Sequence, residues 1–245
     1  MKNERVIILT GANSGIGLAM AKALAETGDR VACFDLEGNR LNGMYYVPCD
    51  VTDPDEVKES VSSVLSKWGR VDILVNNACL ALFSPFSGKS MDDTRRELEV
   101  NYFGYLNMIR AVLPAMQERQ LGIIHNVSST VGITGFSGLS GYAGAKGAIK
   151  AMSRTLAIEL KPDGITVNLI HPPLTRTRSS APIGIPESFM ADPEVVGRRL
   201  AAKIGSTKPI ITAGLADYVG VWASRLAPGF MGSFLSSRTA KAKKV

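Results

Sequence analysis

Tyr142 and Lys146 are the two side chains whose types and spacing best fit proton-transfer chemistry. They lie four residues apart in a stretch with helical character, which places both on one face of a helix. A tyrosine with its ordinary pKa of about 10 is a poor base at neutral pH. An ammonium group about 4 Å away would lower that pKa toward the working range. We therefore predict that Tyr142 is a general acid/base and that Lys146 tunes it.

Ser129 supplies a hydroxyl group that could act with this pair. It follows the apolar run 123–127 and precedes Tyr142 by 13 residues. The carboxyl ends of strands in an open α/β sheet face the crevice in which ligands bind. Ser129 is therefore a candidate for holding a substrate oxygen beside Tyr142, although serine at a strand end is also an ordinary turn former.

A glycine-rich turn follows the first apolar run and precedes a strongly periodic helix. Glycine allows a tight turn and close approach of the backbone to a pyrophosphate, while the helix offers free N–H groups to the phosphate. A glycine-bearing turn with only a structural role is the alternative. The candidate cofactor-binding residues of this turn are Gly11, Asn13, Ser14, Gly15, Ile16 and Gly17.

Asp35 ends the second apolar run, 18 residues after Gly17. A carboxylate at this place accepts hydrogen bonds from the adenosine ribose hydroxyls and repels a 2′-phosphate. Arg40 is the nearby basic residue that could favour the phosphorylated cofactor. The carboxylate favours NAD over NADP, and a loop-capping role for Asp35 is the structural alternative.

Short apolar runs alternate with helical patterns along the whole chain. Continuous Val/Ile/Leu runs are typical of strands covered on both faces, so the alternation predicts an α/β fold with a doubly wound parallel sheet. The expected strands are 6–9, 31–34, 45–47, 71–75, 123–127, 165–170 and 209–212. The expected helices are 16–28, 54–68, 91–117, 140–161, 194–205 and 215–226. Residues 36–43 leave room only for a turn or one helical turn between strands.

The chain shows no repeat or linker, which predicts one domain over residues 1–235. Residues 178–205 are expected to form a lid over the substrate, and their apolar side chains, such as Ile183, Ile185, Phe189 and Met190, hint at an apolar substrate. Residues 236–245 are expected to be a disordered basic tail.

Composition and charge exclude several classes of function. Of the net charge of +6, four positive charges lie in the last eight residues, so the body lacks the basic stripe of a nucleic-acid-binding protein. Neither Cys33, Cys49 and Cys79 nor the histidines His125 and His171 form a metal-binding pattern. We interpret His125 as structural and His171 as a residue that could touch substrate. No leader or membrane-spanning run is evident, so we expect a cytoplasmic protein with reduced cysteines.

Taken jointly, these motifs and several others resemble the classical short-chain dehydrogenase/reductase family. The resemblance covers about residues 5–178. It rests on the turn 10–17, Asp50-Val51, Asn76-Asn77-Ala78, Asn101, Ser129 and the segment from Tyr142 to Lys146. It implies a Rossmann-type sheet of about seven strands with helices on both faces. It also implies a homotetramer or homodimer assembled through helices 91–117 and 140–161.

The resemblance implies further roles for individual residues. Tyr142 would be the general acid/base, Ser129 would orient substrate, and Lys146 would bind the nicotinamide ribose. Asn101 would hold a water in a proton relay, although a helix kink would also explain asparagine there. Asp50 and Val51 would flank the adenine, and Asn77 and Ala78 the adenosine ribose, although Asp50 could instead cap a helix and Asn77 could be a turn residue. Pro172, Thr175, Thr177, Tyr142 and Lys146 would also contact the cofactor.

The sequence departs from the family pattern at two glycine positions. Cys79 stands where the family usually has glycine after Asn-Asn-Ala. Pro173 follows Pro172, where the family usually has the glycine of a Pro-Gly pair. Proline removes an N–H group and fixes φ, so the loop near the carboxamide is expected to differ.

The leading hypothesis is an NAD(H)-dependent oxidoreductase that interconverts a secondary alcohol and a ketone. A carbonyl reductase working mainly in the reducing direction and a nucleotide-sensing protein without chemistry are alternatives. A third alternative is a peripheral membrane enzyme that is anchored by residues 228–245. We disfavour membrane binding because Phe230, Met231, Phe234 and Leu235 more simply cover the core or a subunit interface.

Overall fold

Seven parallel strands form one sheet in the order β3-β2-β1-β4-β5-β6-β7. The computed structural model describes residues 4–41, 43–183 and 185–242. The strands are β1 Val6–Thr10, β2 Arg30–Asp35, β3 Tyr45–Pro48, β4 Ile73–Asn76, β5 Gly122–Val127, β6 Ile165–His171 and β7 Ile210–Thr212. The sequence prediction of a doubly wound parallel sheet is confirmed.

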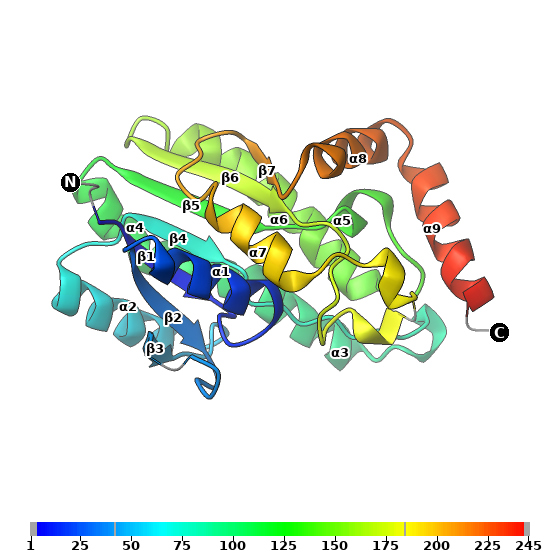
Figure 1. The fold of residues 1–245 in the computed structure, drawn as a ribbon, viewed down its shortest axis with the longest axis horizontal. Helices are drawn as coiled ribbons and strands as arrows, with labels where there is room; N and C mark the ends of the chain where they lie inside the picture. Colours follow the sequence, from blue (N-terminus) through cyan, green and yellow to red (C-terminus); the bar gives the residue numbers. More distant parts are fainter. Residues whose placement is uncertain (1–3, 42, 184, 243–245) are drawn as a thin grey trace.

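Helices cover both faces of this sheet (Figure 1). They are α1 Gly15–Glu26, α2 Pro54–Trp68, α3 Met91–Leu98, α4 Gly104–Glu118, α5 Val131–Thr134, α6 Ser140–Glu159, α7 Pro193–Ala201, α8 Leu215–Leu226 and α9 Pro228–Ala242. One hydrophobic cluster joins the sheet to α2, α4 and α6, and a second joins it to α1 and α7. The strands are buried on both faces, which explains their continuous apolar sequences.

Close packing at the carboxyl end of β1 positions the glycine-rich turn. Gly11 has a φ of +64° and Gly15 a φ of +52°, a conformation that favours glycine. A Cβ atom on Gly17 would lie 2.1 Å from the Gly11 carbonyl oxygen. The position of Gly17 therefore excludes a side chain for steric reasons, and the glycines leave the backbone of the turn accessible.

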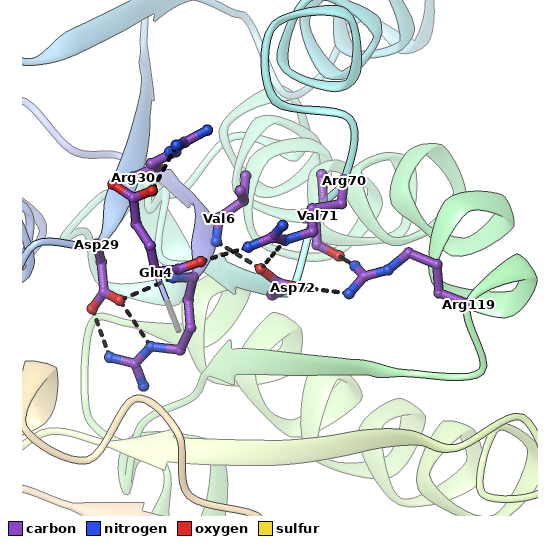
Figure 2. A network of polar contacts seen from close by, with 9 residues as sticks. Glu4, Val6, Asp29, Arg30, Arg70, Val71, Asp72 and Arg119 are labelled. Carbon is purple, nitrogen blue, oxygen red and sulfur yellow. Dashed lines mark hydrogen bonds and ion pairs between the residues drawn. The ribbon is translucent and has the colours of Figure 1, made fainter. Parts of the chain in front are cut away.

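A polar network holds the amino-terminal ends of β1 and β4 together (Figure 2). The Asp72 carboxylate accepts hydrogen bonds from Val6 N at 2.8 Å, Arg70 Nε at 3.0 Å and Arg119 Nη2 at 2.8 Å. Arg70 also donates to the Glu4 carbonyl at 2.6 Å. The network thereby joins β1, the segment before β4 and the end of α4. It lies at the amino-terminal end of the strands, opposite the glycine turn.

Two helices differ from their predicted extents. The stretch expected as one helix over 91–117 is α3, a π-helical turn η2 (Glu99–Phe103) and α4. The helix expected over 194–205 runs from Pro193 to Ala201, with Asp192 capping its amino end. As predicted, the described residues between β2 and β3 contain no helix.

The predicted lid and tail also differ from what the structure contains. Of the predicted lid, the described residues 178–183 and 185–191 are irregular and include two short 3₁₀ turns, whereas α7 is fixed against α1 through Val196 and Leu200. The expected disorder from residue 236 is wrong for residues 236–242, which continue α9. No helix breaker follows Gly232, and Ala, Arg and Lys favour a helix. Residues 243–245 lie outside the described part of the chain.

Candidate active site

A cavity of about 740 Å³ lies at the carboxyl ends of the strands and gathers most of the predicted site residues. Its walls come from the turn after β1, the ends of β2, β4 and β5, and the segment after β6. The predicted residues that line it are Gly11, Ser14, Gly15, Ile16, Gly17, Asp35, Asp50, Val51, Asn77, Ala78, Ser129, Tyr142, Lys146, Pro172, Thr175 and Thr177. Asn13 and Asn101 are not among the lining residues.

Hydrogen bonds between the ends of β1 and β4 fix the floor of this cavity. The Thr10 hydroxyl oxygen accepts from Asn77 N and Ala78 N, both at 3.0 Å. Asn77 Nδ2 donates to the carbonyl oxygens of Thr10 and Gly11 at 3.1 Å. Asn77 thus holds the glycine turn in place, which is a structural role alongside the contact with a ribose that the family resemblance implies.

Asp35 lies at the end of β2 with its carboxylate close to the glycine turn. Its oxygens accept from Asn13 N and Leu36 N, each at 2.8 Å. The Asn13 side chain points away from the cavity, donating to Asn39 Oδ1 at 2.8 Å and accepting from Arg40 N at 2.9 Å. The Asn13 side chain therefore braces the loop that follows β2, and cofactor contact by this residue stays a prediction.

The segments on either side of the cavity are held by local hydrogen bonds. Asp50 accepts from Thr52 N at 2.9 Å, whereas Asp53 caps α2, so Asp50 is not the helix cap. After β6, Thr175 donates to the Pro173 carbonyl at 2.8 Å, and Thr177 N donates to Ser180 Oγ at 2.9 Å. Pro173 lines the cavity next to Pro172, so its ring replaces the N–H group that most family members have there.

Ser129, Tyr142 and Lys146 converge in this cavity from β5 and α6. Ser129 lies close enough to Tyr142 to lower the pKa of its phenol. Lys146 is 1% exposed, and its ammonium donates to Tyr105 Oη at 3.1 Å and to the Val127 carbonyl at 2.9 Å. An ammonium has three N–H donors, so these two acceptors leave one donor for a group in the cavity.

The protonation of Tyr142 differs from the sequence prediction. Burial raises the pKa of its phenol, and the neighbouring Cys79 thiol raises it further, while the hydrogen bond with Ser129 lowers it only in part. Lys146 does not reverse this, because its ammonium lies 5.6 Å from the centre of the Tyr142 ring and donates to other oxygens. The expected acidification is therefore wrong for this structure, and the phenol is protonated at neutral pH.

Asn101 lies on the π-helical turn η2, behind the cavity wall. Its Nδ2 donates to the carbonyl oxygens of Leu80 at 2.6 Å and Glu97 at 2.8 Å. Its Oδ1 is buried and has no hydrogen-bond partner among the described residues. The kink that the asparagine suggested is present as a wider helical turn, and the orphaned oxygen fits a bound water at this place.

Cys79 and Tyr105 are site residues that the sequence prediction did not include. Cys79 lines the cavity and raises the pKa of Tyr142. Tyr105 is fully buried on α4 and donates its hydroxyl hydrogen to the Val127 carbonyl at 3.2 Å while accepting from Lys146. The departure from the family's glycine was a signal in the sequence for Cys79. No sequence pattern indicates Tyr105.

A buried ion pair supports the same region from behind. Lys89 Nζ lies 2.6 Å from Glu97 Oε2, and both side chains are almost fully buried. Glu97 also accepts from Leu82 N at 2.8 Å, and Lys89 donates to the Leu82 carbonyl at 2.6 Å. The pair therefore fixes the segment after β4 onto α3, four residues before Asn101. The sequence shows the charges of Lys89 and Glu97 but not that both side chains are buried, so the pair could not be predicted from it.

The histidines take no part in the cavity. His125 is buried and its ring nitrogens contact Asn168 Oδ1 and, at 2.7 Å, the Ile204 carbonyl, which confirms its structural role. His171 does not line the cavity, and burial lowers its pKa to about 4. Within the described ranges, no three His, Cys, Asp or Glu residues come together as a metal site.

Comparison with known proteins decides the family. A model of the short chain dehydrogenase family matches residues 5–187. The chain belongs to the short-chain dehydrogenase family. A 3-oxoacyl-(acyl-carrier-protein) reductase of Thermotoga maritima is 34% identical over 79% of this chain and 87% of its own length. A 3-ketodihydrosphingosine reductase of Bacteroides thetaiotaomicron is 32% identical over 69% of this chain, and the match spans 63% of that protein.

Solved structures of short-chain dehydrogenases share this fold. One from Streptomyces avermitilis has a TM-score of 0.80 at 28% identity, over 90% of this chain and 92% of that one. A 3-ketoacyl-(acyl-carrier-protein) reductase of Brucella melitensis, solved with NADH, has a TM-score of 0.75 at 27% identity, over 85% and 94%. The family binds a nicotinamide cofactor and acts on small molecules, so this short-chain dehydrogenase is an oxidoreductase.

Removal of one partner of the Lys89–Glu97 pair tests the support behind the site. We expect Lys89→Met to lower the free energy of unfolding by about 3–5 kcal/mol, because it leaves a buried carboxylate without its cation. Lys89→Met/Glu97→Leu should recover most of this loss. Arg95→Met, which breaks an exposed pair on the same helix, should cost less than about 1 kcal/mol. Urea unfolding measures all three, and equal losses in Lys89→Met and Arg95→Met would contradict the interpretation.

Proposed function

We propose that this short-chain dehydrogenase interconverts a secondary alcohol and a ketone with NAD(H). The observation that carries the proposal is the position of Ser129, Tyr142 and Lys146 in the same cavity as the glycine turn and Asp35. The turn and Asp35 suit a dinucleotide, and the three side chains suit proton transfer to or from an oxygen. The bound nicotinamide would supply or accept the hydride.

Tyr142 is the proton donor and acceptor in this proposal. Its raised pKa keeps the phenol protonated at neutral pH, which suits donation of a proton to a ketone oxygen during reduction. For oxidation the same phenol must first lose its proton, so that direction is favoured as the pH rises. The protonation state thus supports ketone reduction near neutral pH.

The neighbouring residues position the reacting groups. Ser129, which lies beside Tyr142, holds the substrate oxygen. Lys146 uses its remaining N–H donor on the nicotinamide ribose. Asn101 holds a water at its buried Oδ1, through which protons exchange with the site. Asp50 and Val51 flank the adenine, and Pro172, Thr175 and Thr177 contact the nicotinamide end.

The cofactor is proposed to be NAD rather than NADP. Asp35 lines the cavity at the end of β2, where its negative charge repels a 2′-phosphate. The solved 3-ketoacyl-(acyl-carrier-protein) reductase with NADH is a structural neighbour that supports this choice.

The substrate is proposed to be an apolar ketone or its alcohol. The cavity lining includes Phe136, Leu139, Ile183 and Ile185, and we propose residues 178–183 and 185–191 as the lid. The names of two relatives refer to a 3-oxoacyl group and to 3-ketodihydrosphingosine, both of which are ketones. The protein is further proposed to act in the cytoplasm as a homo-oligomer assembled through α3, α4 and α6.

Replacement of the phenol tests the proposal directly. Tyr142→Phe should reduce turnover by about 10²–10⁴-fold or more, since it removes the general acid. Binding of NADH, measured by fluorescence titration, should be retained. Tyr218→Phe, on the exposed side of α8, should leave turnover unchanged. Wild-type turnover in Tyr142→Phe would show that another group transfers the proton.

The thiol beside Tyr142 should set the pH dependence of the reaction. Because Cys79 raises the pKa of Tyr142, Cys79→Ala should lower that pKa. The rise of kcat/KM for alcohol oxidation with pH should then move to lower pH, and the fall for ketone reduction should move the same way. Coincident pH profiles for wild type and Cys79→Ala would rule out this influence.

The carboxylate of Asp35 should determine cofactor preference. Asp35→Asn keeps an oxygen that can accept from Asn13 N but removes the charge. The ratio of NADPH to NADH affinity should increase by roughly tenfold or more, given the strength of charge repulsion near a protein surface. Fluorescence titration with both cofactors measures the ratio. A preference for NADPH in the wild type would overturn the assignment.

A further inference from the structure

An exposed apolar face runs along α8, away from the candidate active site residues. Leu215, Val219, Trp222 and Leu226 recur at helical spacing, and Leu215 and Leu226 are 79% and 84% exposed. These side chains do not cover the core, since of α8 only Val221 and Ser224 are buried. A contiguous apolar face of this kind on a protein surface marks an interaction site.

Helix α9 follows α8 and packs against α5 (Figure 1), and it also carries exposed apolar side chains. Phe230 is 70% exposed, and its ring stacks on that of Phe234 with centroids 6.1 Å apart. Of the two interpretations of Phe230, as cover for the core or for a subunit interface, the first is therefore wrong. The opposite side of α9 holds it to the body, because Gly232 packs against the Thr134 carbonyl and Ser236 Oγ accepts from Ser137 N at 3.1 Å.

Positive charge without acidic partners flanks the apolar face. Arg225 lies over the Trp222 ring, 5.0 Å from its centre. Burial and the repulsion among Lys150, Arg154 and Arg225 lower the pKa values of Lys150 and Arg225. Within the described part of the chain, none of these three forms an ion pair.

The sequence continues this charge asymmetry to its end. Residues 218–245 contain no Asp or Glu, whereas they contain Arg225, Arg238, Lys241, Lys243 and Lys244. Asp217 is in the first turn of α8. The sequence from residue 218 onward therefore carries only positive charges among its ionised side chains.

We propose that the exposed face of α8 and α9 binds the surface of an anionic lipid bilayer. Leu226, Phe230 and their apolar neighbours would enter the boundary between head groups and acyl chains, and the cations would meet lipid phosphates. Trp222 suits this boundary because its ring has an apolar body and a polar N–H group. Among the described residues no helix is long and apolar enough to cross a membrane, so the attachment is peripheral. This proposal goes beyond the oxidoreductase function.

The charges favour a bilayer over a second copy of the chain as the occupant. A two-fold interface through this face would bring the cations of both copies into one interface without acidic partners. An anionic bilayer neutralises them instead. The location also suits an apolar substrate, because α9 packs on the segment 134–137 and Phe136 from that segment lines the cavity.

Flotation with vesicles tests the proposal on the full chain. We expect the protein to float with vesicles of phosphatidylcholine containing phosphatidylserine, but not with phosphatidylcholine alone, and raised salt should weaken the binding. Failure to float with the anionic vesicles would overturn the proposal. Equal binding to both kinds of vesicle would overturn the role of the cations. NADH binding is measured in parallel, so loss of the site and loss of membrane binding remain distinguishable.

Variants locate the binding face. Leu226→Gln/Phe230→Gln should lose flotation, while Leu121→Gln, at the opposite end of the sheet, should retain it. Lys150→Gln/Arg154→Gln should weaken binding by about fivefold for each charge removed, whereas Lys58→Gln on α2 should not. If the α8–α9 variant instead changes the oligomeric state in size-exclusion chromatography and floats as wild type does, the face joins two copies of the chain and the proposal is wrong.

Discussion

The ammonium group of Lys146 has to remain inside the protein, and the rest of the site is arranged around this requirement. Burial disfavours the charge and lowers its pKa, so the ammonium needs acceptors that do not move. Tyr105 and the Val127 carbonyl supply them, and Tyr105 is itself fixed to Val127. The end of β5 is thereby tied to α4 and α6, and Ser129 and Tyr142 are carried on the elements that this contact joins. A nicotinamide ribose would accept the third hydrogen bond of the ammonium.

Much of the fold and of the candidate site follows from short-range pattern together with topology. The continuous apolar strands and periodic helices are enough to predict the doubly wound sheet, and the parallel arrangement brings the carboxyl ends of the strands to one edge. Gly11, Asp35, Ser129 and Tyr142 each follow a strand or begin a helix there, so their convergence in one cavity could be predicted. The glycine turn is a strong case, because the close contact of Gly17 with Gly11 permits no side chain.

The remaining features depend on burial and on contacts between distant residues, which no local pattern contains. The pKa of Tyr142 was predicted to fall and is instead raised, because the sequence shows the spacing to Lys146 but neither the burial of the phenol nor the two oxygens that hold the ammonium. The hydrogen bond from Asn13 to Asn39 was not predicted, because the sequence shows the place of Asn13 in the turn but not that contact. The Lys89–Glu97 pair looks like two ordinary charges, and the exposure of Phe230 could not be predicted because apolar residues in a terminal helix are usually buried.

The network around Asp72 has a consequence for the behaviour of the protein in acid. Burial alone would raise the pKa of this carboxyl group, but hydrogen bonds from Val6, Arg70 and Arg119 outweigh it and leave the pKa below its ordinary value. The resulting stabilisation is present above the ordinary pKa and disappears as the pH falls through the lowered one. Asp72 lies at the amino-terminal ends of β1 and β4, so acidification would destabilise the end of the sheet that is remote from the cavity. Tolerance of low pH is in this respect a property of the scaffold, independent of which ketone or alcohol occupies the pocket.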